Sequence, residues 1–129
     1  MELKLNKELQ NKLRLFLEIK DSKLIEFLSL LNIDKFSFLL EEINMLEEIY
    51  KKDKNIRGYL YIYIGEAVIN VRGGFWSIGK FRKDEAYGLP IILGWGENEN
   101  SPRICPDVWL KRIDSNRLRK SLGEMIYSL

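Results

Sequence analysis

Residues 58–76 are the least polar stretch of this chain, and Glu66 is the only charged residue between Arg57 and Arg72. A segment this apolar has to lie near the centre of the fold. Its first half, Tyr-Leu-Tyr-Ile-Tyr-Ile, has the aromatic and β-branched composition of a strand. The segment is long for a strand, however, and its apolar residues also recur at spacings of three and four. We therefore predict a buried helix over residues 58–72.

The residues before this segment predict three helices. The first is capped by Asn6 and ends at residues 21–22, where Asp-Ser provides a break and a new N-cap. The second covers residues 24–31. The third is capped by Asp34 and continues to Tyr50, and the lysines that follow it suit the negative end of a helix dipole.

The residues after this segment change in character, from helical spacing to short alternating runs and then back to helical spacing. In chain order we predict strands at 75–82, 89–95 and 103–105, a helical turn over 106–113 and a last helix from about 115 to 129. Helices followed by a small antiparallel sheet and a C-terminal helix are typical of the α+β class. The length fits a single domain over residues 1–129, with a helical part at 1–56 and the central helix, sheet and last helix at 57–129.

Histidine is absent, and Cys105 is the only cysteine. The usual zinc sites and the Ser-His-Asp and Cys-His catalytic arrangements are therefore impossible within this chain, as is an internal disulfide. We predict a protein that is not an enzyme and that holds no metal and no cofactor. A single cysteine fits a reducing cytoplasm, the N-terminus lacks the apolar core of a secretory signal, and the run at 58–71 is too short to span a bilayer. We expect a cytoplasmic protein that does not enter membranes.

Glu66 is an acid in apolar surroundings, and two interpretations are open. Burial would raise its pKa, as in a general acid. The favoured interpretation is structural, with Glu66 either exposed or paired with one of Arg57, Arg72, Lys111 or Arg112.

Five further residues are predicted to be structural. Gly65 is small enough to let a neighbouring element approach closely. Gly73 and Gly74 lack the spacing of a phosphate-binding loop, so we expect them to cap the central helix and turn the chain. Trp76 and Trp109 are expected to fill the layer between helices and sheet.

Paired glutamates are most simply explained as a solvated helix face. If the chain binds another protein, we predict that two acidic regions form the contact surface. A tryptophan left exposed would also serve such an interface. The predicted contact residues are Glu41, Glu42, Glu47, Glu48, Trp95, Glu97 and Glu99. A basic cluster near the C-terminus could instead meet an acidic protein or a phosphate backbone, and it consists of Lys111, Arg112, Arg117, Arg119 and Lys120.

Four short segments form a pattern: Tyr-Ile-Gly-Glu at 63–66, Gly-Gly-Phe-Trp at 73–76, Gly-Leu-Pro at 88–90, and Pro106 with Val-x-x-Lys-Arg-Ile at 108–113. The pattern resembles small bacterial proteins, some of them encoded near secreted-toxin systems and thought to act as immunity proteins. The resemblance implies a non-enzymatic cytoplasmic protein that binds and neutralises a cognate toxin. The alternative is a nucleic-acid-binding or regulatory module that uses the basic cluster.

Overall fold

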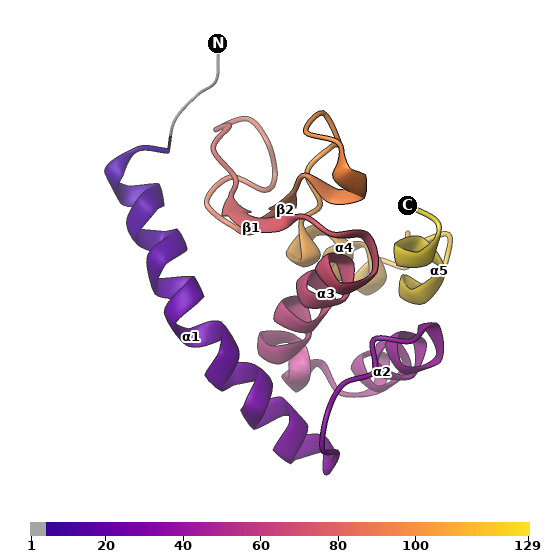
Figure 1. Ribbon diagram of the computed structural model, residues 1–129. Helices are drawn as coiled ribbons and strands as arrows, with labels where there is room; N and C mark the ends of the chain where they lie inside the picture. Colours follow the sequence, from indigo (N-terminus) through magenta and orange to yellow (C-terminus); the bar gives the residue numbers. More distant parts are fainter. Residues whose placement is uncertain (1–4) are drawn as a thin grey trace.

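We describe residues 5–129 of the chain from a computed structural model. These residues form five α-helices and a two-stranded antiparallel sheet, which confirms the α+β class (Figure 1). In chain order the elements are α1 (Lys7–Leu31), α2 (Leu40–Lys52), the 3-10 helix η1 (Lys54–Ile56), α3 (Arg57–Arg72), β1 (Phe75–Ile78), β2 (Pro90–Leu93), the 3-10 helix η2 (Trp95–Glu97), α4 (Pro106–Asp114) and α5 (Leu122–Tyr127).

The predicted helix over residues 58–72 is confirmed. This helix, α3, lies at the centre of the molecule, between α1 on one side and α4 and α5 on the other (Figure 1). A helix that is apolar on several faces has to be buried on several faces, and six of its side chains are fully buried: Leu60, Ile62, Tyr63, Ile64, Ala67 and Val68.

Helix α1 is continuous, so the predicted break at residues 21–22 is wrong. Asn6 caps its start as expected, because the Asn6 side chain accepts the backbone N–H of Leu9 at 2.9 Å. Within the helix, the Ser22 hydroxyl donates to the carbonyl of Ile19 at 2.9 Å. A serine that bonds back to the preceding turn fits inside a helix and does not end it.

Helix α2 begins at Leu40, so Asp34 is not its N-cap. The chain before it is held by Glu42, whose carboxylate accepts the backbone N–H groups of Ser37 and Phe38 at 3.0 to 3.1 Å. A glutamate in the first turn of a helix that reaches back to preceding N–H groups acts like half of a capping box. This arrangement fixes the non-helical segment between α1 and α2.

The sheet is smaller than predicted. β1 and β2 cover only part of the expected strands at 75–82 and 89–95. Gly94, whose φ is 71°, ends β2. The third predicted strand, at 103–105, is reduced to a single antiparallel bridge between Ile104 and Ile92.

Two glycines turn the chain from α3 into β1. Gly73 has φ of 80° and Gly74 has φ of 102°, values that favour glycine over other residues. The backbone N–H of Gly73 donates to the carbonyl of Ile69 at 2.9 Å and so closes the last turn of the helix. This turn delivers Trp76 back against α3.

The ring of Trp76 occupies the space left by the missing side chain of Gly65. A Cβ at residue 65 would lie only 1.9 Å from Cη2 of that ring. The ring of Phe16 on α1 also packs against the indole, with centroids 4.6 Å apart. Three elements, α1, α3 and β1, therefore meet at one tryptophan.

Glu66 belongs to the same junction. Its carboxylate accepts a hydrogen bond from Trp76 Nε1 at 3.2 Å and one from Lys20 Nζ at 3.1 Å. Burial alone would lower the pKa of Lys20, but hydrogen bonds to Asp21 and Glu66 raise it. The partner of Glu66 is thus Lys20, and this corrects the expectation that it would be Arg57, Arg72, Lys111 or Arg112.

The close approach at residue 65 predicts that Gly65→Ala lowers the free energy of unfolding by about 2 kcal/mol, because an added methyl group in a packed interior forces its neighbours apart. Gly58→Ala is the matched control on the same helix, since a Cβ there would meet nothing within 4 Å. We expect the control to leave stability unchanged or to raise it by up to about 1 kcal/mol through helix propensity. Urea unfolding measures the free energy of unfolding of both variants. Equal changes in the two variants would contradict the packing of Trp76 against Gly65.

Candidate functional site: a basic pocket between α4 and α5

The predicted acidic residues of α2 differ in their exposure to solvent. Glu41 and Glu48 are exposed, whereas Glu47 is only 5% exposed. Glu47 accepts the backbone N–H of Leu122 at 2.7 Å and pairs with Lys51 at 3.3 Å. It therefore holds the start of α5 to α2, a structural role that the sequence did not predict.

Glu42 is likewise committed to contacts within the chain. Besides the two backbone N–H groups described above, it accepts the hydroxyl of Tyr63 at 2.8 Å. Burial alone would raise the pKa of Glu42, but the hydrogen bonds from Ser37, Tyr63 and Phe38 lower it. Burial, together with the hydrogen bond to Glu42, raises the pKa of Tyr63. These bonds engage the Glu42 oxygens within the chain, so Glu42 also has a structural role, and its contact with a partner stays a prediction.

The second predicted acidic region lies on the loop after β2. Trp95 is half-buried, and its indole N–H donates to the carbonyl of Pro102 at 2.7 Å. Its own carbonyl accepts the hydroxyl of Ser101 at 2.7 Å. Glu97 and Glu99 are exposed. The hydrogen bonds of Trp95 therefore close the loop on itself, and residues 96–100, including the two glutamates, are exposed.

The basic cluster is brought together by the end of α4. The predicted helix from about residue 115 to 129 begins only at Leu122, because the chain turns at Asn116, whose φ of 55° is left-handed. Its N–H donates to the carbonyl of Ile113 at 3.0 Å, and the N–H of Arg117 donates to the carbonyl of Arg112 at 2.7 Å. This bond pattern is a Schellman motif, which ends a helix and reverses the chain. The motif places Arg117 beside Arg112.

The following segment is fixed at its far end by the start of α5. Ser121 caps this helix, and its hydroxyl accepts the N–H of Glu124 at 3.2 Å. The side chains of α2 complete the cap: Glu47 accepts the N–H of Leu122, and Asn44 accepts that of Gly123 at 2.9 Å. Residues 117–120 are consequently held between two hydrogen-bonded anchors.

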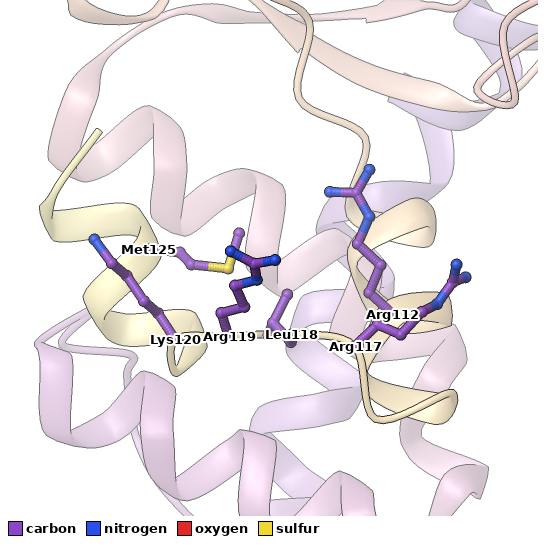
Figure 2. A pocket seen from close by; sticks show the side chains of 6 residues that line it. All are labelled: Arg112, Arg117, Leu118, Arg119, Lys120 and Met125. Carbon is purple, nitrogen blue, oxygen red and sulfur yellow. The ribbon is translucent and has the colours of Figure 1, made fainter.

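An open pocket of about 460 Å³ lies between α4 and α5. Figure 2 shows the Arg112 side chain rising on one side of this pocket and the Arg119 side chain beside Met125 on the other. The basic pocket, as we call it below, is lined by Arg112, Arg117, Leu118, Arg119, Lys120 and Met125.

The charges of the basic pocket are largely unneutralised. Arg112 approaches Glu85 at 3.6 Å on the protein surface, and Arg117 donates through Nε to the hydroxyl of Ser115 at 2.8 Å. Within residues 5–129, Arg117, Arg119 and Lys120 make no ion pair. Cations held together without counter-ions attract anions, and guanidinium groups bind carboxylates or phosphates through two parallel hydrogen bonds.

The pocket is lined by groups suited to binding anions. The side chains that line it are cationic or apolar. Cys105 lies elsewhere in a buried position, where burial raises the pKa of its thiol and so disfavours the nucleophilic thiolate. Among residues 5–129 no group of acidic, cysteine or histidine side chains is arranged to hold a metal ion. In the same part of the chain, no helix has the length and apolar character needed to cross a bilayer.

A second polar cluster joins α2, α3 and α4 and was not predicted. Arg57 donates to the hydroxyl of Tyr50 at 2.7 Å and to Asp114 at 3.1 Å, and Lys54 donates to Asp114 at 3.0 Å. Asp107 lies 3.7 Å from Arg57. Its pKa is raised by burial, which outweighs the opposing effect of Arg57. Because the cations and acids satisfy one another, this cluster acts as a clamp between helices.

Comparison of the chain with protein-family models, with curated proteins and with solved structures finds no match. The functional argument therefore depends on the geometry of the basic pocket and on the residues that surround it.

The contacts of Glu42 predict a pH-dependent contribution to stability. Its pKa is lowered by folding, so its stabilising effect is complete above its ordinary pKa of 4.5 and disappears as the pH falls through the folded value. Glu42→Gln should lower the free energy of unfolding at pH 7 by about 2 kcal/mol, because the charged acceptor of several hydrogen bonds is lost. At pH 3 the difference from the wild type should be much smaller.

Urea unfolding at the two pH values measures this difference. Glu41→Gln is the control, because Glu41 is the exposed neighbour of Glu42 and makes no hydrogen bond or ion pair with residues 5–129. A loss of stability that is the same at pH 3 and pH 7 would contradict this role for Glu42.

Proposed function

We propose that this chain is a non-enzymatic binding protein that holds an acidic segment of a protein partner in its basic pocket. The observation that carries the proposal is the grouping of Arg112, Arg117, Arg119 and Lys120 around one pocket, where among residues 5–129 only Arg112 forms an ion pair, with Glu85. Positive charge on a rigid surface accelerates association with an acidic partner and selects it over others.

The composition of the pocket favours a protein over a nucleic acid. Leu118 and Met125 provide an apolar floor between the cations, and arginine with methionine is enriched at protein interfaces. Single-stranded nucleic acids need exposed aromatic rings on which bases stack. No aromatic side chain lines the pocket, and both Trp76 and Trp109 are buried. An acidic and partly apolar peptide segment fits these features better.

The sequence resemblance to proteins thought to confer immunity makes a cognate toxin the proposed class of partner. In this proposal the chain contacts its partner through basic residues, whereas the sequence predicted contact through acidic ones. The toxin would present acidic groups to the basic pocket, since Glu42 and Glu47 are engaged inside the chain. Binding alone would neutralise the toxin, because occlusion of its active surface requires no chemistry from this protein.

A pair of charge-reversal variants tests the proposal. Arg112→Glu/Arg119→Glu removes the attraction and adds repulsion, so capture of the acidic partner from the native host should fall at least about 100-fold. Lys52→Glu/Lys83→Glu changes the net charge by the same amount at two exposed positions outside the pocket. This control should capture the partner as the wild type does. Quantitative mass spectrometry measures the amount of partner that each double variant captures relative to the wild type.

Three results would overturn the proposal. One is the absence of any specifically captured protein, and another is equal capture by the pocket variant and the control. The third is recovery of DNA or RNA in place of protein, with binding that weakens steeply as salt is added. That last result would establish the nucleic-acid alternative.

A further inference from the structure

Glu85 offers a carboxylate of the chain itself to the basic pocket. Its Oε1 lies 3.6 Å from Nη2 of Arg112, which lines the pocket on the α4 side together with Arg117 (Figure 2). Within residues 5–129, Glu85 is the only acid that pairs with a side chain lining the pocket. This contact therefore affects one cation of the pocket and leaves the others unpaired.

A hydrogen-bonded turn fixes the backbone at Glu85. The preceding residue, Asp84, accepts two hydrogen bonds from Arg103, one from Nε at 2.9 Å and one from Nη2 at 2.6 Å. These bonds lower the pKa of the Asp84 carboxyl. The N–H of Asp84 donates to the carbonyl of Phe81, and the N–H of Tyr87 donates to the carbonyl of Asp84, both at 3.0 Å. Glu85 therefore projects from a backbone that is held on both sides.

The Glu85 carboxylate itself is held weakly. Its second contact, with Nη2 of Arg103, is 4.0 Å long, and its side chain is 53% exposed. The side chain of Arg112 is 44% exposed. An ion pair in such an exposed position contributes little to stability. A carboxylate from another molecule can therefore replace Glu85 at Arg112 without disturbing the fold.

We infer that Glu85 competes with the acidic partner for Arg112 and so directs the partner to the other cations of the pocket. These cations are Arg117, Arg119 and Lys120, which form no ion pair within residues 5–129. A carboxylate that approaches Arg112 meets the negative charge of Glu85, and like charges at this separation repel. The inference rests on the proposed function of the basic pocket and specifies which of its residues hold the partner.

Binding of a fluorescein-labelled acidic peptide tests the competition. The probe is acetylated and amidated and carries two glutamates on either side of a central leucine. Fluorescence anisotropy at about 20 mM salt, where exposed charges are little screened, measures its dissociation constant. Glu85→Gln should lower this constant about threefold, because it removes both the pairing with Arg112 and the repulsion of the probe.

Glu8→Gln is the matched control for the change in net charge. Glu8 is exposed in the first turn of α1, and it makes no hydrogen bond or ion pair with residues 5–129. Helices α1 and α5 lie on opposite sides of α3, so this residue is remote from the basic pocket (Figure 1). The control should leave the dissociation constant of the probe unchanged.

A double-mutant cycle locates the effect at Arg112. In the wild type, Arg112→Gln should weaken binding of the probe about twofold and Arg119→Gln about tenfold, because only Arg112 is already paired. In the Glu85→Gln background, Arg112→Gln should weaken binding about sixfold, since the two residues are coupled. The loss caused by Arg119→Gln should be the same in both backgrounds.

Two results would overturn the competition while leaving the proposed function of the pocket intact. One is an equal gain in affinity from Glu85→Gln and Glu8→Gln. The other is a gain from Glu85→Gln that persists at full size when Arg112 has been replaced by Gln. Absence of binding by the wild type and by every variant has a different meaning, because it would overturn the proposed function and the competition that rests on it.

Discussion

The contact between Trp76 and Gly65 is the interaction on which the arrangement of this protein depends. The indole ring fills the volume that any side chain at residue 65 would need. Its N–H is bound by Glu66, which also receives Lys20 from α1. A single tryptophan thereby joins the longest helix, the central helix and the sheet, with Phe16 also packed against the indole. Glu66, the acid in the apolar segment, therefore has a structural role.

Much of the fold was predictable because its central helix has a simple physical signature. A run of this length with a single charge, small residues inside it and a glycine pair after it is consistent with few structures. Lys20 was missed although the sequence carried a signal for it. It stands between Phe16 and Leu24 on the buried stripe of α1, and a charge on such a stripe requires a nearby acid.

The candidate site was less predictable because its decisive contacts join distant residues. Glu47 binds the backbone of Leu122, and no local pattern in the sequence reveals a carboxylate used in this way. The hydrogen bond from the Tyr63 hydroxyl to Glu42 is likewise not revealed by any local pattern in the sequence. The end of α4 at Asn116 depends on left-handed backbone geometry that asparagine tolerates but does not require. These contacts engage two predicted acidic residues within the chain and bring the arginines around one pocket.

The most direct test of the account is a photo-crosslinking measurement in the native host. A benzophenone-bearing residue replaces either Lys120, at the edge of the basic pocket, or Glu48, exposed on α2. The account predicts a covalent adduct with one acidic protein from position 120 and none from position 48. An adduct from position 48 alone, or no protein adduct from position 120, would contradict the claim that the basic pocket is the partner-binding surface.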